Sequence, residues 1–439
     1  MTPTPPATPG APALLLVGGA ASGGHGADST RRTIGAARAL GLAVHLTDLP
    51  EALAAATAVT ALADRVTALD HERPGTCARW ARSGAAGEVR AVFSSREYAQ
   101  EGAAAIADAL GLPGNDPELV ATVRRKDRCR AALAEAGFRQ PAVALCQDVH
   151  QARAFAAAHP GPWIVKPRDA MGSLGVTLVE APGALEAAVA ALPAAGPFLV
   201  EEYVPGPEFS VEGVLTGGRP TVLAVTAKQV TAPPLFVELA HALPAPVDTG
   251  VRDGLAREAA AAVTALGLRH GVFHVEAWWT PQGPVLGEVH TRFGGDWLHL
   301  MLEHVLDADV SDAVLRDLLG LPVPRLAPRP GRAAAVLFPT PDAGTVTALH
   351  GWDRLAGLPG VLHADPQLTP DDTVPPLTDS AARRGVLVTA AEDARAALDL
   401  ARRLATDVGT TVRAPSGART APDRSEQPPH LRVRDPQEH

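Results

Sequence analysis

Lysine is scarce in this chain, and its positions are the first candidates for chemistry. Of the 39 Lys and Arg residues, only Lys126, Lys166 and Lys228 are lysines. A composition that favours arginine this strongly is expected to keep lysine where a compact ammonium cannot be exchanged for a planar guanidinium. For any one of them, the alternative is a solvated surface position. The motif around each lysine therefore decides between the two interpretations.

Lys166 ends a short apolar segment that a glycine turn follows. Residues 163–167 predict a buried strand, and a run with Gly172, Ser173 and Gly175 precedes a second strand. Small residues let backbone N–H groups approach a polyphosphate, the serine adds a hydroxyl donor, and the lysine adds a positive charge. The motif is not a Walker A loop, because lysine does not directly follow the second glycine and no helix comes next. A purely structural β-hairpin is the alternative.

Carboxylates follow on the next two predicted strands. The segment 198–204 ends so that its backbone groups and Glu201 could be presented to an adenine edge. On the following strand, Glu208, Ser210 and Glu212 share one face by the two-residue period. A carboxylate at Glu208 matches the paired hydroxyls of a ribose. A solvated strand edge is the alternative, and it is the preferred interpretation for Glu212.

Residues 271–292 predict a β-hairpin with a three-residue loop and acidic residues on both strands. In that register Glu276 faces Glu288, and His274 faces His290. Two carboxylates that face each other in a half-buried sheet repel, unless a cation lies between them. Mg²⁺ prefers carboxylates and nucleotide phosphates, so it is the cation that the hairpin predicts.

Alternating strands and helices predict an α/β fold around these motifs. A strand over 13–17, a helix over 30–40 and a further strand open the chain as a βαβ unit, which predicts a Rossmann-like domain with a parallel sheet. The glycine run 18–26 is not GxGxxG in register, so it is predicted as a tight turn without a cofactor. Residues 115–117, Asn-Asp-Pro, predict the start of a helix that carries Lys126.

The chain divides into three predicted units and two tails. Changes in composition and periodicity place an N-terminal Rossmann-like domain at 13–115, a second α/β domain at 116–320, a C-terminal α/β region at 321–409, and disordered tails at 1–12 and 410–439.

Composition excludes several classes of function. With 46% hydrophobic and 20% charged residues, the chain is typical of a globular protein. A net charge of -9 without a Lys/Arg-rich block argues against binding to nucleic acid or to an anionic membrane. No export signal is visible, and no apolar stretch approaches the roughly 18 residues that span a bilayer. Three cysteines without a pairing pattern fit a reducing cytoplasm. Small molecules are the expected partners, and a homodimer is left open.

Taken in chain order, these motifs resemble the signature of the ATP-grasp superfamily of carboxylate–amine ligases. The resemblance covers 116–320, with a lid subdomain at about 140–204. Two segments most resemble the L-amino acid ligases, which join amino acids into dipeptides or related amides. They are Phe-Val-Glu-Leu-Ala-His at 236–241 and Glu-Val-His-Thr-Arg-Phe-Gly-Gly at 288–295.

The resemblance implies a role for each matching residue. It implies that the ATP phosphates are bound by Lys126, Lys166, Gly172, Ser173 and Gly175, with Lys228 also reaching the nucleotide. Adenine would be held by Glu201, Glu202 and the backbone of Val204, the ribose by Glu208, and magnesium by Glu276 and Glu288. The acyl phosphate would be stabilised by Arg292, and the first amino acid would lie beside Glu238, His241, Gly294 and Gly295.

One position departs from the superfamily pattern. At His290 many relatives carry an asparagine that binds the second metal ion. Imidazole is a poorer ligand for Mg²⁺ than a carbonyl oxygen. The choice between Mg²⁺ and Mn²⁺, and the second metal site itself, therefore stay open.

The activity that the resemblance implies is transfer of the ATP γ-phosphoryl group to a carboxylate, followed by attack of an amine on the acyl phosphate. Such phosphoryl transfer needs positioned cations and a site closed to water. Two alternatives differ from this activity. One is another ATP-grasp ligase, of the purine-pathway or carboxylase type, and the other is a nucleotide-binding regulatory protein without catalysis.

Overall fold

The first apolar segment, residues 13–17, is an inner strand of a parallel sheet, and its leucines are fully buried. The computed structural model describes residues 11–414. The N-terminal sheet has the order β3-β2-β1-β4, with parallel pairs throughout. Its strands are β1 (Ala13–Val17), β2 (Ala43–Asp48), β3 (Arg65–Ala68) and β4 (Val89–Phe93). Its helices are α1 (Gly24–Ala39), α2 (Pro50–Ala55), α3 (Thr57–Thr60), α4 (Pro74–Arg82) and α5 (Gln100–Leu110). The 3₁₀ turn η1 (Glu97–Ala99) directly precedes α5. The predicted parallel sheet is confirmed.

Helix α1 begins at Gly24, inside the glycine run, and not at Thr30 as predicted. The turn before it is fixed by two hydrogen bonds. Asp48 Oδ2 accepts from the N–H of Ala20 at 2.8 Å, and Thr30 Oγ1 donates to the carbonyl of Gly19 at 3.1 Å. The run therefore supplies both a tight turn and the first residues of the helix.

The helix predicted to carry Lys126 is two helices. Asp116 caps the first one, and its side chain accepts from two backbone N–H groups, as predicted. The chain then leaves helical geometry at Arg125, with φ -94° and ψ 107°. These helices are α6 (Pro117–Arg124) and α7 (Lys126–Glu135). The break puts Lys126 at the first position of α7, where its side chain reaches toward the lid.

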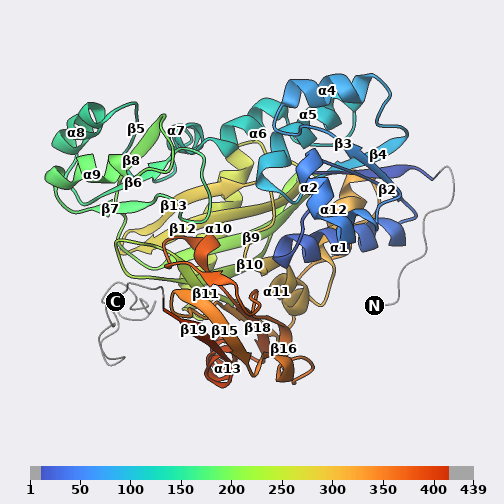
Figure 1. Cartoon of the computed structure of the whole chain (residues 1–439). Coiled ribbons are helices and arrows are strands. Elements are labelled where there is room, and N and C mark those ends of the chain that lie inside the picture. The colour runs from blue at the N-terminus through green and yellow to red at the C-terminus, as the bar shows by residue number, and fades with distance from the viewer. Residues whose placement is uncertain (1–10, 415–439) are drawn as a thin grey trace.

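The lid is a four-stranded antiparallel sheet of order β5-β8-β6-β7, at the upper left of Figure 1. Two helices, α8 and α9, pack in its core. Its elements are β5 (Val143–Cys146), α8 (Val149–Ala158), β6 (Trp163–Pro167), β7 (Thr177–Val179), the 3₁₀ turn η2 (Pro182–Ala184), α9 (Leu185–Ala190) and β8 (Phe198–Glu202).

An eight-stranded sheet of order β13-β12-β9-β10-β11-β14-β18-β16 forms the centre of the molecule (Figure 1). Its strands are β9 (Glu208–Thr216), β10 (Arg219–Val230), β11 (Glu238–Leu243), β12 (Gly271–Thr280), β13 (Gly283–His290), β14 (Ala333–Leu337), β16 (Val361–Asp365) and β18 (Val386–Ala391). Its helices are α10 (Thr249–Ala265), α11 (Leu298–Leu306), α12 (Val310–Leu318) and α13 (Ala394–Asp407). A small sheet holds β15 (Gly344–His350), β17 (Thr373–Val374) and β19 (Gly409–Arg413), and the turns η3 (Trp352–Arg354) and η4 (Ser380–Ala382) complete the C-terminal region.

Three local predictions are corrected by these sheets. The prolines around residues 236–241 predict an extended or irregular substrate loop, whereas residues 238–243 are an inner strand, because β11 pairs with both β10 and β14. The hairpin loop has two residues, since Gly283 pairs with Thr280. The C-terminal tail does not begin at 410, because residues 409–413 pair with β15. The rest of that predicted tail, and residues 1–10 of the N-terminal one, lie outside the described residues.

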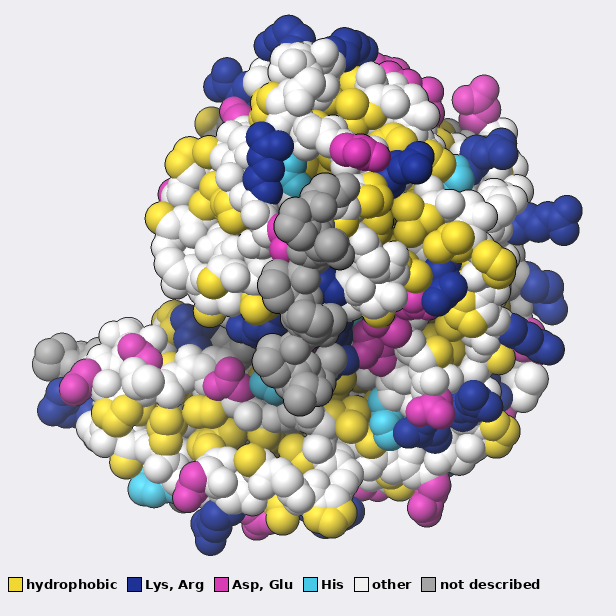
Figure 2. Space-filling view, turned by 90° about the vertical axis from the view of Figure 1, so that its right-hand side faces the viewer, with side chains coloured by type: hydrophobic (Ala, Val, Ile, Leu, Met, Phe, Trp, Pro, Cys, Tyr) yellow, Lys and Arg dark blue, Asp and Glu magenta, His cyan; other side chains and the backbone are white. Residues whose placement is uncertain are grey.

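The N-terminal domain and the central sheet share one hydrophobic core. Leu14 and Phe93 of the first sheet belong to the same buried cluster as Val272 of β12, Met301 of α11 and Val336 of β14. The predicted boundaries near 115 and 320 therefore do not separate independent cores. On the face shown in Figure 2, Lys and Arg side chains alternate with Asp and Glu, without a broad patch of one charge. Over residues 11–414, no helix has the length and apolar character needed to cross a membrane.

Candidate active site

One cavity between the lid and the central sheet gathers most of the residues that the sequence singles out, including all three lysines. The predicted residues that line it are Lys126, Lys166, Gly172, Ser173, Glu201, Glu202, Val204, Glu208, Lys228, Glu238, Glu276, Glu288, His290 and Arg292. Four other predicted residues, Gly175, His241, Gly294 and Gly295, are not part of its lining.

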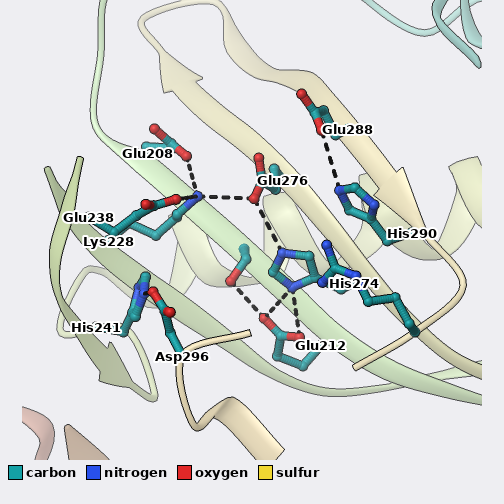
Figure 3. A network of polar contacts seen from close by, with 12 residues as sticks. Glu208, Glu212, Lys228, Glu238, His241, His274, Glu276, Glu288, His290 and Asp296 are labelled. Atoms are coloured by element: carbon teal, nitrogen blue, oxygen red, sulfur yellow. Dashed lines mark hydrogen bonds and ion pairs between the residues drawn. The ribbon is translucent and has the colours of Figure 1, made fainter. Parts of the chain in front are cut away.

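Lys228 of β10 is the centre of an ion-pair cluster in this cavity (Figure 3). Its Nζ contacts the carboxylate of Glu208, and it lies 3.1 Å from Glu276 Oε1 and 3.6 Å from Glu238 Oε1. Burial alone would lower the pKa of Lys228, but the three carboxylates outweigh it and raise that pKa well above its usual value. The lysine is therefore a permanent cation at neutral pH, and it holds three acidic side chains from three strands around one point.

Lys126 and Lys166 together hold Glu288. Lys126 Nζ lies 3.3 Å from Glu288 Oε2, and Lys166 Nζ lies 3.4 Å from Glu288 Oε1. Lys126 also donates to the carbonyl of Ala170 in the glycine turn, at 2.8 Å. Burial raises the pKa of Glu288, but these two charges and His290 lower it further than burial raises it, so the pKa lies well below the usual range. Two lysines and a carboxylate thus converge beside the turn.

The carboxylate of Glu201 faces a buried arginine, a contact that the sequence did not predict. Arg130 of α7 donates to both oxygens of Glu201, at 2.6 and 3.0 Å, and Lys166 Nζ lies 3.0 Å from the same carboxylate. Arg130 is only 1% exposed. A bidentate pair of this kind orients a side chain firmly. The sequence offered no signal for Arg130, because arginine is abundant and only tertiary contact shows its partner.

The facing histidines of the hairpin are confirmed, whereas the facing carboxylates are only near the predicted register. His274 pairs with His290, but the register shifts between Val275 and Ala277, so Glu276 lies at a bulge and has no partner directly opposite. A β-bulge of this kind re-aims a side chain. The bulge gives Glu276 its own direction into the cavity.

A buried histidine fixes Glu276 from below (Figure 3). His274 Nδ1 lies 2.9 Å from Glu212 Oε2, and its Nε2 lies 3.3 Å from Glu276 Oε1. Burial would lower the pKa of His274, but Glu212 and Glu276 raise it to about 9. Ser210 Oγ donates to Glu212 at 2.6 Å. Glu212 is therefore a buried partner of His274 and not the solvated edge residue that the sequence favoured.

The donor set at Glu276 and Glu288 fits a magnesium ion that is held partly by phosphates. Mg²⁺ is commonly bound by one or two carboxylates together with substrate phosphates and water. Both carboxylates line the cavity, and lysines stand beside each of them. Among the described residues, no group of three or more His, Cys, Asp or Glu side chains forms a metal cage by itself. His290 is already engaged, since its ring nitrogens face Glu97 at 3.1 Å and Glu288 at 3.4 Å.

Arg292 is oriented by a residue of the N-terminal domain. Glu97 Oε2 accepts from Arg292 Nε at 2.6 Å and lies 3.1 Å from His290 Nδ1. Burial raises the pKa of Glu97, but His290, Arg292 and Arg124 together bring it far below its usual range. The sequence missed Glu97, which lies almost 200 positions from its partners along the chain and in no motif.

Glu238 and His241 of β11 face a second set of partners that the sequence also missed. Ser380 Oγ donates to the Glu238 carboxylate. His241 Nε2 lies 2.9 Å from Asp296 Oδ2, and Arg383 donates to both oxygens of Asp296, at 2.7 and 2.6 Å. Asp296 directly follows the Gly-Gly pair, so extending that motif by one residue would have found it. Ser380 and Arg383 come from the C-terminal region, for which the sequence gave no motif.

The predicted glycines have different roles in the structure. Gly172 lies in the turn at φ 64°, and its carbonyl accepts from the N–H of Ser380 at 2.9 Å. A Cβ on Gly175 would approach Pro193 to 2.7 Å, and one on Gly294 would approach Leu298 to 2.4 Å. Packing leaves no room for a side chain at these two positions, and Gly175 in addition has a φ of 71°. A Cβ on Gly295 would have His25 Nε2 as its nearest atom, at 4.0 Å.

The glycine turn lies closed over the cavity. Ser173 Oγ donates to the carbonyl of Phe236 at 2.8 Å, and the Ser380 bond to Gly172 ties the turn to the C-terminal region. The cavity volume is about 160 Å³, below the roughly 300 to 1,000 Å³ of ordinary ligand pockets. Entry of a nucleotide therefore requires the turn to lift.

Comparison with known proteins agrees with this geometry. Residues 159–299 match the ATP-grasp domain family, and residues 336–413 match the L-amino acid ligase C-terminal domain 2. Carnosine synthase 1 of Gallus gallus is 33% identical over 275 residues, which cover 56% of this chain and 30% of that protein. The chain thus spans less than a third of the length of this relative.

Two solved structures show the same fold. The L-amino acid ligase of Bacillus licheniformis superposes with a TM-score of 0.73 at 21% identity, covering 92% of this chain and 99% of the other. The biotin carboxylase domain of the Hydrogenobacter thermophilus 2-oxoglutarate carboxylase, solved with MgADP and bicarbonate, has a TM-score of 0.67 at 17% identity, covering 91% and 90%. At such identities the likeness concerns the fold alone. The chain therefore contains an ATP-grasp domain at 159–299, followed at 336–413 by an L-amino acid ligase C-terminal domain 2.

Proposed function

We propose that this chain uses ATP to activate the carboxylate of an amino acid as an acyl phosphate and then joins it to an amine. The observation that carries the proposal is the convergence of all three lysines with Glu276 and Glu288 in one cavity. This is the arrangement that a polyphosphate with its counter-ion requires, because positive charges must meet the phosphate oxygens while carboxylates bind the metal.

In this proposal Lys126 and Lys166 share one task, and Lys228 has another. Lys126 and Lys166 would leave Glu288 and meet phosphate oxygens when the nucleotide enters, and the buried pair of Glu201 with Arg130 keeps Lys166 aimed. Lys228 would reach the nucleotide from below while Glu208 moves to the ribose. The ends of β8 and the backbone at Val204 would hold adenine, with Glu202 at the entrance. Glu201 acts here through Lys166 and not on adenine.

Magnesium bound at Glu276 and Glu288 would draw negative charge from the phosphate oxygens. His274 holds Glu276 in place, and Glu288 becomes available to the ion once the two lysines turn to the phosphates. Arg292 would stabilise the charge on the transferred phosphoryl group, because Glu97 fixes its guanidinium at the cavity wall. The closed glycine turn with Ser173 would exclude water from the reactive anhydride. Glu238 would receive the α-ammonium of the activated amino acid, with His241 behind it.

The alternative ATP-grasp functions have less support. Likeness to the carboxylase domain rests on the fold alone, whereas the match over 336–413 is to a domain of amino acid ligases. A regulatory protein without catalysis would have no need of Arg292 and of two metal-binding carboxylates held by separate lysines. The use of Mn²⁺, a cytoplasmic location and a homodimer stay predictions of the sequence, which metal substitution, cell fractionation and gel filtration would test.

The test of the proposal is direct. The protein is incubated with Mg-ATP and pooled L-amino acids, and ADP, phosphate and new masses are measured. Amino-acid-dependent ADP and a product lighter by one water than the sum of two substrates are expected, and Glu288→Gln serves as the inactive control. ADP formation that depends on bicarbonate and not on amino acids would favour the carboxylase alternative instead.

A further inference from the structure

A second cavity of about 530 Å³ opens beside the catalytic one, where three parts of the chain meet. The first turn of α1 contributes His25, the segment after β13 contributes Asp296 and Trp297, and the C-terminal region contributes Ser380, Arg383 and Arg384. The sequence predicted no site at His25 or in the C-terminal region. We call this cavity the side pocket.

The side pocket shares a wall with the catalytic cavity. Ser380 lines the side pocket and donates to Glu238, which lines the catalytic cavity. The same serine is tied by its N–H to Gly172 of the glycine turn. On the other side, His25 lies against Gly295, three residues beyond Arg292. A molecule in the side pocket would therefore lie next to the proposed acyl phosphate.

The backbone at this wall is held in a costly conformation. Asp296 and Trp297 are consecutive residues in the left-handed region, with φ 54° and 65°. Non-glycine residues rarely adopt this conformation, which gathers at binding and catalytic sites. Trp297 is only 4% exposed and stacks on His363 with ring centroids 3.8 Å apart. The stack holds the wall in this shape.

The charges of the side pocket leave one cation available. Asp296 is bound by His241 and twice by Arg383, whose guanidinium also lies 3.8 Å from the centroid of the Phe338 ring. Asp372 accepts from the N–H and hydroxyl of Thr369. Arg384, in contrast, has hydrogen bonds within residues 11–414 only to the carbonyls of Ala381 and Arg383. In addition to the hydrogen bonds from Thr369, its charge lowers the pKa of Asp372 in the same pocket, but no salt bridge of Arg384 is formed within residues 11–414, so the guanidinium can still bind an anion.

His25 supplies the complementary group. Within the described part of the chain its ring forms no hydrogen bond, and it is exposed to the open pocket. Desolvation by the protein around the ring is the main cause that lowers the pKa of His25. The charges of Arg383 and Arg292 lower this pKa further, whereas the charge of Asp296 raises it. The imidazole is therefore neutral near pH 7 and presents a lone pair that can accept a hydrogen bond from an amine.

We propose that the side pocket binds the acceptor amine, that this amine carries a carboxylate, and that Arg384 binds the carboxylate while His25 accepts from the amine N–H. The proposal rests on the ligase function proposed above. In the step itself the uncharged amine nitrogen forms a bond to the acyl carbon, and the bond from that carbon to the phosphate oxygen breaks. Phosphate leaves with the electron pair, and the proton lost by nitrogen passes to His25 and then to solvent.

Two reactions of the whole protein test the assignment. With Mg-ATP and single L-amino acids, hydroxylamine traps the acyl phosphate as a hydroxamate and needs no carboxylate on the acceptor. Amide synthesis is then measured with glycine and with glycinamide, which differ only in that carboxylate. For Arg384→Ala, the KM for glycine is expected to rise about tenfold more than the KM for glycinamide, since the charge-assisted bond is lost only with glycine.

The conservative variant and a surface control complete the design. Arg384→Lys is expected to recover part of the preference for glycine, and His25→Ala to lower the rate of amide synthesis more than that of hydroxamate formation. Arg402→Ala, an exposed position of α13, is the matched surface control. An equal rise of both KM values in Arg384→Ala would overturn the side pocket as the acceptor site and leave the ligase function standing. Failure of the unchanged protein to give any hydroxamate would overturn the ligase function, and the acceptor site with it.

Discussion

The Nε of Arg292 lies 2.6 Å from Oε2 of Glu97, and the two residues belong to different parts of the fold. Glu97 comes from the 3₁₀ turn before α5 in the N-terminal domain, whereas Arg292 follows β13 of the central sheet. The same carboxylate faces His290 at 3.1 Å. The N-terminal domain, for which the sequence predicted no ligand, therefore sets the position of the arginine proposed to stabilise the acyl phosphate.

Glu97→Gln is expected to lower kcat by about 100-fold, because a misplaced catalytic group costs that much even at a displacement near 1 Å. The KM for ATP is expected to change little, since Glu97 does not line the catalytic cavity. Steady-state kinetics measures the split. Glu101→Gln, which removes a partner of Arg124 instead, is the matched control. Equal kcat in both variants would contradict the positioning role.

Lys166→Arg is expected to abolish ATP turnover although the charge is retained. Lys166 is 7% exposed, and its ammonium fits between Glu201 and Glu288, a position for which a planar guanidinium has neither the space nor the geometry. ADP release reports turnover, and circular dichroism checks the fold. Full activity in this variant would remove the argument that lysine is retained for its shape.

Glu276→Gln and Glu288→Gln are each expected to lose metal-dependent activity while the protein stays folded. Each change removes a proposed metal ligand, but it also removes a half-buried negative charge. Activity is measured across a titration with Mg²⁺, and thermal unfolding is followed in parallel. Should either variant keep full activity at low Mg²⁺, the paired-carboxylate interpretation would be wrong.

Glu238→Ala is expected to raise the KM for the amino acid that is activated, by about tenfold, and to leave the KM for ATP nearly unchanged. The reason is that a carboxylate pairs with the α-ammonium, and its loss weakens binding without touching the nucleotide. Hydroxamate formation isolates this step from amide synthesis. His241→Ala tests whether the histidine on the same strand contributes to binding of this amino acid. If neither variant alters the kinetics of the amino acid, Glu238 has no role in its binding.

Asp28→Asn is expected to destabilise the protein at neutral pH by about 2 kcal/mol. Burial raises the pKa of Asp28, but the hydrogen bonds from His299 and Arg32 outweigh burial. The pKa of Asp28 therefore falls from 3.8 to about 2. The pKa of His299 is itself lowered by burial, so this histidine is a neutral hydrogen-bond donor and not an ion-pair partner. Because the folded pKa is depressed, the stability is present above pH 3.8 and is lost as the pH falls toward about 2. Urea unfolding of both proteins should show their difference shrinking over that interval.

The sequence predicted the parts of the site that lie within short motifs. Lys166 with its turn and the hairpin around His274 and His290 needed only strand alternation and local spacing. The pairing of Glu201 with Arg130 could not be predicted, because it is a tertiary contact that no local pattern reveals. The prolines that flank residues 238–243 indicate an extended or irregular path, and only the pairing with β14 shows that the segment is an inner strand. Side chains supplied by other parts of the fold, such as Glu97 and Arg383, could not be predicted either, because only tertiary contacts bring them to the site.

The continuous central sheet has a consequence for how this chain can be divided. β14 and β18 of the C-terminal region extend the sheet from β11, which carries Glu238 and His241. A chain cut after 320 would leave β11 with a row of unpaired N–H and C=O groups and with the apolar side chains that now pack against β14. Such an open edge recruits strands of other molecules. Residues 1–320 are thus not a separable catalytic module. Any exchange of the C-terminal region between relatives must preserve the pairing of β11 with β14.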